Sequence, residues 1–189
     1  MRPSALHRPW PTWWAAGMTV LVAYATKNGS TAELARWIGD ELRDCGLAVE
    51  VRPAADLSDV GAYEAVVLGA CVYMAGWHTD ARHFAHRFAG QLRTRPVWLF
   101  SSGPLDTSAD RDELAPVPHV ATVMREVQAR GHVTFGGRLS PDGHGWLGFV
   151  ARRMAAEGHG GDFRNPARVR AWARDIATRL VEARTTRRA

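Results

Sequence analysis

The sequence contains little cysteine and no grouping of cysteine with histidine that is typical of a metal site. Its 189 residues include two cysteines, Cys45 and Cys71, and no CxxC pair. Two cysteines are too few for a disulfide-stabilised scaffold, and their spacing does not indicate zinc. We therefore expect a reduced, cytoplasmic protein without a metal, stabilised by one hydrophobic core.

Long apolar runs are also missing. No segment has the roughly 18 or more uninterrupted apolar residues that a membrane-spanning helix needs. Residues 1–17 are rich in proline and tryptophan but lack the apolar stretch and cleavage site of a secretory signal. We expect them to be a disordered extension or the result of a misassigned start ahead of Met18. If the extension is translated, Trp10, Trp13 and Trp14 can touch a membrane interface.

Lysine is nearly absent, because all but one of the 24 basic residues are arginines, which are spread along the chain. The net charge of +5 favours anionic partners, such as acidic lipid headgroups or carboxylate-bearing substrates. A general arginine preference explains most of the bias equally well. No helix-turn-helix, zinc-finger or RNP pattern accompanies the charge, so we expect no nucleic-acid partner.

Apolar runs and helical periodicity alternate from residue 19 onwards. The pattern predicts strands over residues 19–24, 47–53, 64–70, 95–103 and 132–137. It predicts helices over residues 30–46, 79–92, 118–131 and 165–184. We expect an α/β fold in which a five-stranded parallel sheet carries helices on both faces, forming a three-layer sandwich. This domain would span residues 18–184, followed by a basic tail at 185–189.

The single lysine lies in the loop "TKNGST", directly after the first predicted strand. Ligands of open parallel sheets bind beyond the carboxyl ends of the strands. Hydroxyl side chains, a glycine and the start of a helix can together bind an anion. The loop matches neither GxGxxG nor GxxxxGK[ST], so a monophosphate fits better than a dinucleotide or a nucleoside triphosphate. The alternative is ordinary helix capping by serine and threonine.

The run Tyr24-x-Thr26-x-x-Gly29-x-Thr31-x-x-x-Ala35-x-x-Ile38 resembles the flavodoxin signature, with Ala23 where a larger residue is common. The resemblance covers Met18 to about Leu180. The segments "VVLGACVYMAGWH", "GGRLSP" and "GGDFR" are most similar to the flavodoxin-domain branch that includes menaquinone-dependent protoporphyrinogen dehydrogenases. The resemblance implies a flavodoxin-like fold with strand order 2-1-3-4-5 and FMN as the cofactor.

The same resemblance implies which residues bind FMN. Those expected at the phosphate are Thr26, Lys27, Asn28, Gly29, Ser30 and Thr31. Those expected at the flavin ring, by stacking or through backbone groups, are Ala70, Cys71, Val72, Tyr73, Trp77, Ser102, Gly103, Pro104 and Leu105. Stacked aromatic rings help set the potential of a flavin, although one of these aromatic residues can instead fill the rim of the sheet.

Three further residues have both a functional and an ordinary interpretation. Cys71 is either a redox thiol or a small apolar filler. His78 is a candidate acid and base, or a residue at the start of a helix. Arg138 can meet a flavin phosphate or a substrate carboxylate, or form a surface salt bridge.

The connection between the fifth strand and the last helix is longer than the fold requires. Residues 146–154 include apolar positions at helical spacing, with Arg152 and Arg153 at the polar edge. This segment either packs on the rim of the sheet or forms a lid that faces a membrane or a quinone.

Three functions follow from this reading. The first is an FMN-dependent dehydrogenase that passes electrons from an organic donor to a quinone, with protoporphyrinogen as the donor that the resemblance implies. Such an enzyme would work either in the cytoplasm or peripherally at the inner face of the cell membrane. The second is a flavodoxin-like carrier that serves redox proteins and has no substrate of its own. The third is a non-catalytic flavin-binding regulator.

Overall fold

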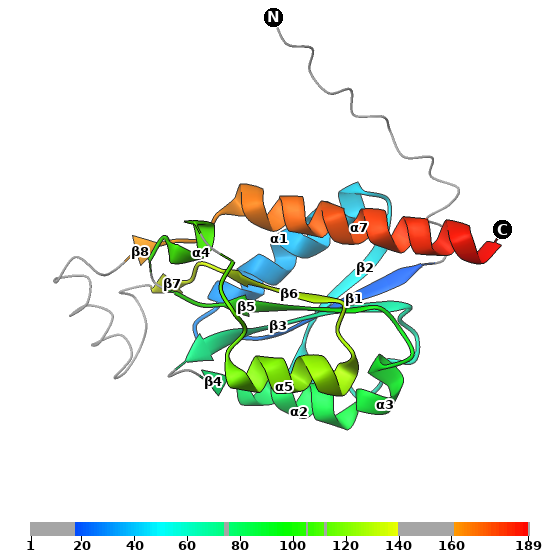
Figure 1. Cartoon of the computed structure of the whole chain (residues 1–189), viewed down its shortest axis with the longest axis horizontal. Coiled ribbons are helices and arrows are strands. Elements are labelled where there is room, and N and C mark those ends of the chain that lie inside the picture. Colours follow the sequence, from blue (N-terminus) through cyan, green and yellow to red (C-terminus); the bar gives the residue numbers. More distant parts are fainter. Residues whose placement is uncertain (1–17, 74–75, 105, 112, 140–160, 189) are drawn as a thin grey trace, which may run out of the picture.

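The computed structural model describes residues 18–188 except 74–75, 105, 112 and 140–160. A parallel sheet of five strands lies at its centre in the order β2-β1-β3-β5-β6 (Figure 1). The strands are β1 (Thr19–Ala25), β2 (Ala48–Pro53), β3 (Ala65–Tyr73), β5 (Val97–Ser102) and β6 (Gly131–Phe135). Five parallel strands and the order 2-1-3-4-5 along the chain are confirmed.

Helices cover both faces of the sheet, as the alternating pattern predicts (Figure 1). On one face lie α1 (Ser30–Asp44) and α7 (Pro166–Arg188). On the other lie α2 (Thr79–Arg87), α3 (Ala89–Leu92) and α5 (Pro118–Val127). Two shorter elements are η1 (Ala54–Asp56) and α4 (Ser108–Arg111). Helix α7 continues into the residues that the sequence assigned to a basic tail.

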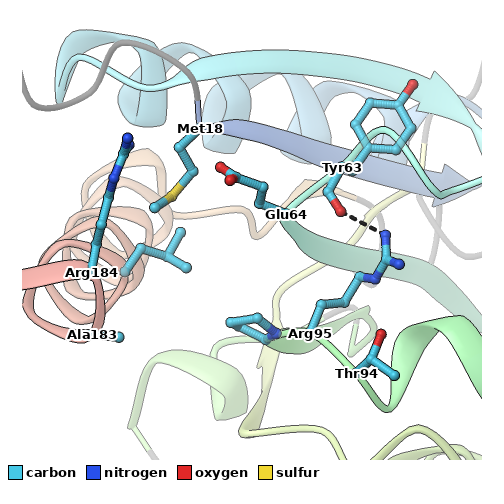
Figure 2. Close-up of a pocket in the computed structure, with 9 residues that line it drawn as sticks. Met18, Tyr63, Glu64, Thr94, Arg95, Ala183 and Arg184 are labelled. Atoms are coloured by element: carbon cyan, nitrogen blue, oxygen red, sulfur yellow. Dashed lines mark hydrogen bonds between the residues drawn. The ribbon is translucent and has the colours of Figure 1, made fainter. Parts of the chain in front are cut away.

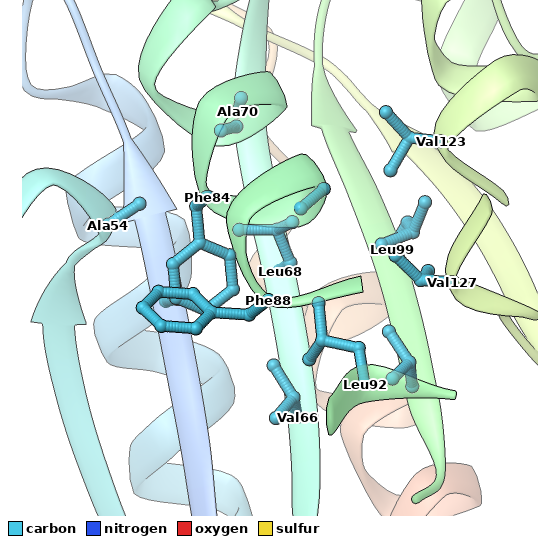
Figure 3. Packing of buried hydrophobic residues seen from close by; sticks show 14 of the residues in the cluster. Ala54, Val66, Leu68, Ala70, Phe84, Phe88, Leu92, Leu99, Val123 and Val127 are labelled. Carbon is cyan, nitrogen blue, oxygen red and sulfur yellow. The ribbon is translucent and has the colours of Figure 1, made fainter. Parts of the chain in front are cut away.

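Each helical layer packs on its own side of the sheet because side chains of a strand alternate between the two faces. Leu34, Ile38 and Leu42 of α1 are fully buried against one face. Figure 3 shows the other face, where Phe84 and Phe88 lie over the strands. Their rings meet edge to face with centroids 5.1 Å apart. Within the described ranges, no helix is both long enough and apolar enough to cross a lipid bilayer.

Three features are not predicted by the sequence pattern. Strand β4 (Gly76–Trp77) pairs antiparallel with the end of β3 and gives the sheet a sixth, short strand. A separate ribbon joins β7 (Arg138–Leu139) to β8 (Gly161–Asp162). The helix predicted over residues 79–92 is divided in two at Phe88, whose φ of −105° departs from helical geometry.

A glycine in the middle of β3 permits close packing of the sheet against its helices. Gly69 pairs with Phe100 of β5. A Cβ atom on Gly69 would collide with the ring of Phe100, which is fully buried. The ring also packs against Phe135 and Trp172, with centroids 6.2 and 6.3 Å away. These neighbours leave it little room to move.

We expect Gly69→Ala to lower the free energy of unfolding by about 1–3 kcal/mol, because overpacking forces the ring and the backbone to shift. Urea denaturation measures the change. Gly90→Ala is the matched control, since open space surrounds the position of its Cβ and its φ is not in the left-handed region. Equal stability of the two variants would contradict the packing described for Gly69.

A histidine links the two strands at one edge of the sheet. His132 of β6 lies with its Nε2 2.8 Å from Oγ of Ser101 of β5. Burial lowers the pKa of His132 from 6.5 to about 4, because a charged imidazolium would lose its hydration there. The folded protein therefore holds this side chain neutral at physiological pH.

This burial predicts a pH-dependent stability. The unfolded chain protonates this histidine near pH 6.5 and the folded chain only near pH 4. The free energy of unfolding is therefore largest above pH 6.5 and decreases by about 1–3 kcal/mol as the pH falls from 6.5 to 4. The measurement is the difference in unfolding free energy between the native chain and His132→Gln across this range. A difference that does not change with pH would refute the burial of a neutral imidazole.

Candidate functional site

Three loops leave the carboxyl edge of the sheet next to one another. Ala25, the last residue of β1, is paired with Ala70 of β3, and Cys71 is paired with Ser102, the last residue of β5. Because the three strands are parallel, the loops that follow them begin at the same edge. The structure thus brings the predicted phosphate loop together with the two segments predicted at the flavin ring.

The loop between β1 and α1 is held in a tight turn. Gly29 has φ of +81°, a left-handed conformation that side-chain-bearing residues rarely adopt. Its N–H donates to Oγ1 of Thr26 at 3.0 Å. No atom lies within 4 Å of the position that a Cβ of Gly29 would occupy. The turn therefore leaves open space at the beginning of α1.

Thr31, in the first turn of α1, has the polar side chain that most clearly points to a ligand. The residue is fully buried, and its Oγ1 has no hydrogen-bond partner among the described residues. An unpaired buried hydroxyl costs free energy, which a bound acceptor would recover. N–H groups of the first helical turn and the helix dipole also favour an anion here. The residues therefore fit a phosphate.

The other predicted members of the loop differ in their availability. Ser30 is buried, and its Oγ accepts the backbone N–H of Arg138 at 3.2 Å, which leaves its own proton available for donation. Asn28 is exposed, and its side chain forms no hydrogen bond with another described residue. It is therefore available to a ligand.

Lys27 and Tyr73 join the predicted phosphate loop to the end of β3. Lys27 is exposed, and its Nζ lies 4.3 Å from the centroid of the Tyr73 ring. Tyr73 is the one large apolar side chain of the described chain that is substantially exposed, at 41%. A cation over an aromatic face is attracted by the quadrupole of the ring. Tyr73 therefore offers the available aromatic surface at this edge.

Trp77 does not offer such a surface. Pairing of β4 with β3 turns this side chain into the core on the face of the sheet that α2 and α5 cover, where it is 2% exposed. Its Nε1 is buried without a hydrogen-bond partner in the described structure. The ordinary interpretation, an aromatic residue that fills the sheet rim, describes Trp77, whereas Tyr73 stays a candidate for contact with the flavin.

Several backbone groups predicted at the ring edge already have partners. The carbonyl of Cys71 accepts the N–H of His78 at 3.1 Å, and the N–H of Gly103 donates to the carbonyl of Phe135 at 2.9 Å. The carbonyl of Pro104 accepts the N–H of Gly137 at 2.9 Å. These bonds fix the two loops against the sheet. Of the remaining residues predicted at the ring edge, Val72 packs against the core, and Ala70 and Ser102 are buried. Leu105 lies outside the described residues, and so does the predicted lid segment 146–154.

The environment of Cys71 favours a structural role. Burial raises the pKa of its thiol, although a hydrogen bond from the Lys27 backbone and the Lys27 charge act in the opposite direction. A reactive cysteine needs a lowered pKa. The structure therefore supports the apolar-filler interpretation.

His78 caps α2. Its Nδ1 accepts the backbone N–H of Asp80 at 3.3 Å and lies 3.7 Å from the Asp80 carboxylate. Such a bond satisfies one of the free N–H groups at a helix start. This geometry matches the ordinary interpretation, a histidine at the beginning of a helix.

Arg138 belongs to a network of four charged side chains beside the phosphate loop. Its guanidinium lies 2.6 Å from the Glu33 carboxylate, and Arg164 contacts both Glu33 and Asp162 at 2.6 Å. Arg164 is buried and also stacks over Trp37, 4.9 Å from its centroid. The network fastens β7 and β8 to the first turn of α1.

The pKa of Glu33 reflects this arrangement. Burial acts to raise it, but the hydrogen bonds and charges of Arg164 and Arg138 prevail and hold the pKa below its usual value. Glu33 is therefore ionised, and each arginine has a carboxylate partner. Sequence analysis missed this network because Glu33 and Arg164 are separated by 131 positions.

One cavity lies away from these loops, at the opposite edge of the sheet. It has a volume of about 420 Å³ and is lined by Met18, Tyr63, Arg95 and residues of α7 (Figure 2). Arg95 donates to the backbone carbonyls of Val60 and Tyr63, so its charge already has acceptors. The cavity lies at the amino ends of the strands, where ligands of such sheets do not usually bind.

Comparison with known proteins agrees with this architecture. A family model described as a flavodoxin domain matches residues 21–162. Protoporphyrinogen IX dehydrogenase [quinone] of Escherichia coli strain K12 is 26% identical over 86 residues, which are 44% of this chain and 48% of the relative. The match thus spans about half the length of that curated relative. The same protein name and values are found for Escherichia coli O157:H7.

Two solved structures show the same fold. A flavodoxin from the domain Archaea has a TM-score of 0.58 at 16% identity and covers 87% of this chain and 99% of its own. Rubredoxin oxygen:oxidoreductase of Desulfovibrio gigas has a TM-score of 0.57 at 14% identity, and the match covers 90% of this chain and 38% of the oxidoreductase chain. Since the family model spans most of the chain and the strand order agrees with it, this chain belongs to the flavodoxin domain family.

Proposed function

We propose that this protein is an FMN-dependent oxidoreductase that transfers electrons from an organic donor to a quinone. Membership of the flavodoxin domain family indicates FMN as the cofactor. The observation that carries the FMN-dependent part of the proposal is the buried, unpaired hydroxyl of Thr31 at the start of α1. A phosphate there would supply the acceptor that the protein does not.

Two parts of the described structure, the start of α1 and the end of β3, would bind different parts of FMN. Thr31, Ser30 and the N–H groups of α1 would hold the phosphate, while Tyr73 would contact the flavin ring. When bound, FMN supplies the redox chemistry, accepting hydride equivalents and releasing electrons. The protein orients the reactants and fixes the loops through bonds such as the one from Gly103 to Phe135.

A porphyrinogen donor and a quinone acceptor are supported by two observations. The partial sequence match is to a protoporphyrinogen IX dehydrogenase [quinone]. The net charge of +5 suits a donor with carboxylate side chains and a peripheral contact with an anionic membrane surface. Residues 146–154, which we propose to face the quinone, lie outside the described residues and come between β7 and β8 in the sequence. The Glu33 network attaches these two strands to the start of α1.

A carrier without its own substrate is the second candidate, and the geometry of His78 and Arg138 favours it. His78 caps a helix and Arg138 is paired with Glu33, so neither predicted catalytic group is free in the described structure. A carrier needs no such group, because the flavin exchanges electrons with a redox protein directly.

Thr31→Val tests the phosphate site. We expect FMN to bind at least about tenfold more weakly, because a hydrogen bond to a charged group contributes about 1.5–3 kcal/mol. Riboflavin, which lacks the phosphate, should bind as it does to the native chain. The stability of the apoprotein should not fall, because the removed hydroxyl has no partner.

Quenching of flavin fluorescence gives the affinities in this test. Thr122→Val is the matched control, since that threonine is exposed on α5 and its hydroxyl bonds only within its own helix, to the carbonyl of Pro118 and the side chain of Arg125. FMN affinity that survives the loss of the Thr31 hydroxyl would contradict the phosphate assignment.

Turnover distinguishes an enzyme from a carrier. We expect the FMN-loaded protein to oxidise protoporphyrinogen IX anaerobically when a soluble menaquinone analogue is present, with the quinone reduced in proportion. Absorbance of the porphyrin follows the reaction. FMN-loaded protein that exchanges electrons with a redox protein but oxidises no porphyrinogen would favour the carrier, and an inert flavin would indicate a regulator.

A further inference from the structure

Lys27 is the basic side chain at the site whose charge has no carboxylate partner. Arg138 and Arg164 are paired with Glu33 and Asp162, and these four charges cancel. Among the described residues Lys27 forms no ion pair. Its charge therefore acts on the site without local compensation by a carboxylate.

The side chain of Lys27 reaches away from its own loop. Its backbone belongs to the turn between β1 and α1, but its Nζ lies 4.3 Å from the centre of the ring of Tyr73, the last residue of β3. The cation–π contact favours this position over a freely moving one. The positive charge is thus held at the aromatic wall of the site, although the sequence places it in the phosphate loop.

A charge at that wall distinguishes between the two redox states of a flavin. Addition of two electrons and one proton gives the ring one more negative charge than it has when oxidised. A nearby cation stabilises this charge by Coulomb attraction. A phosphate, in contrast, has the same charge in both states, so contact with it would not alter the potential.

We propose that Lys27, held against Tyr73, raises the reduction potential of the bound flavin by stabilising its reduced form. The inference rests on the proposed binding of FMN at this site. It assigns to Lys27 a role in setting the redox equilibrium, separate from the phosphate contact that its place in the loop predicts.

Lys27→Met tests this role, because it removes the charge and keeps a long apolar side chain. We expect the ratio of reduced-FMN to oxidised-FMN affinity to fall about tenfold, which corresponds to about 30 mV more negative for a two-electron couple. Lys27→Arg keeps a cation that can stack on Tyr73, and it should stay near the native ratio. Arg179→Gln, at an exposed position on α7, makes the same change in net charge and should have no effect.

The measurements are fluorescence titration with oxidised FMN and an anaerobic redox titration with dithionite against a dye of known potential. Equal weakening of both redox forms by Lys27→Met would place the charge at the phosphate and overturn the inference. An unchanged ratio would overturn it as well. Failure of the native chain to bind FMN is a different result, which would remove the proposed function and this inference together.

Discussion

The position of β1 between β2 and β3 is the constraint on which the site depends. From β1 the chain crosses to α1 on one face of the sheet, and from β3 it continues to α2 on the other face. The two loops therefore separate at the carboxyl edge and leave space between them, as at the switch point of other open α/β sheets. Buried apolar runs in β1, β3 and β5 hold this geometry, because both of their faces are covered by helices.

Charge is distributed around this space in two ways. Arg138 and Arg164 meet the carboxylates of Glu33 and Asp162, and their contacts attach the β7–β8 ribbon to the beginning of α1. Loss of one member of such a network would leave the charge of its partner partly buried and uncompensated. The intact network therefore fixes the positions of β7, β8 and α1 relative to one another. Lys27 is different, since its ammonium group forms no ion pair among the described residues and lies over the ring of Tyr73. The site thus combines a network of four side chains with no net charge and the single positive charge of Lys27, which no carboxylate neutralises among the described residues.

The sequence predicted the features that depend on local periodicity. Leu34, Ile38 and Leu42 repeat at helical spacing and are buried, and the loop proposed to bind phosphate lies between β1 and α1. It did not predict β4, because a two-residue strand has no periodicity. The flavodoxin resemblance implied that Trp77 lies at the flavin, but the side chain enters the core. The pairing of Arg138 with Glu33 was also not predictable, because it joins residues 105 positions apart.

The central claim, that the turn between β1 and α1 binds a phosphate, is tested most directly by calorimetric titration of the native apoprotein with FMN, FAD and riboflavin. The account predicts that FMN binds more tightly than both of the others, with riboflavin weakened by the loss of its phosphate. Riboflavin binding as tightly as FMN, or no flavin binding at all, would contradict it and leave the loop as a capped turn.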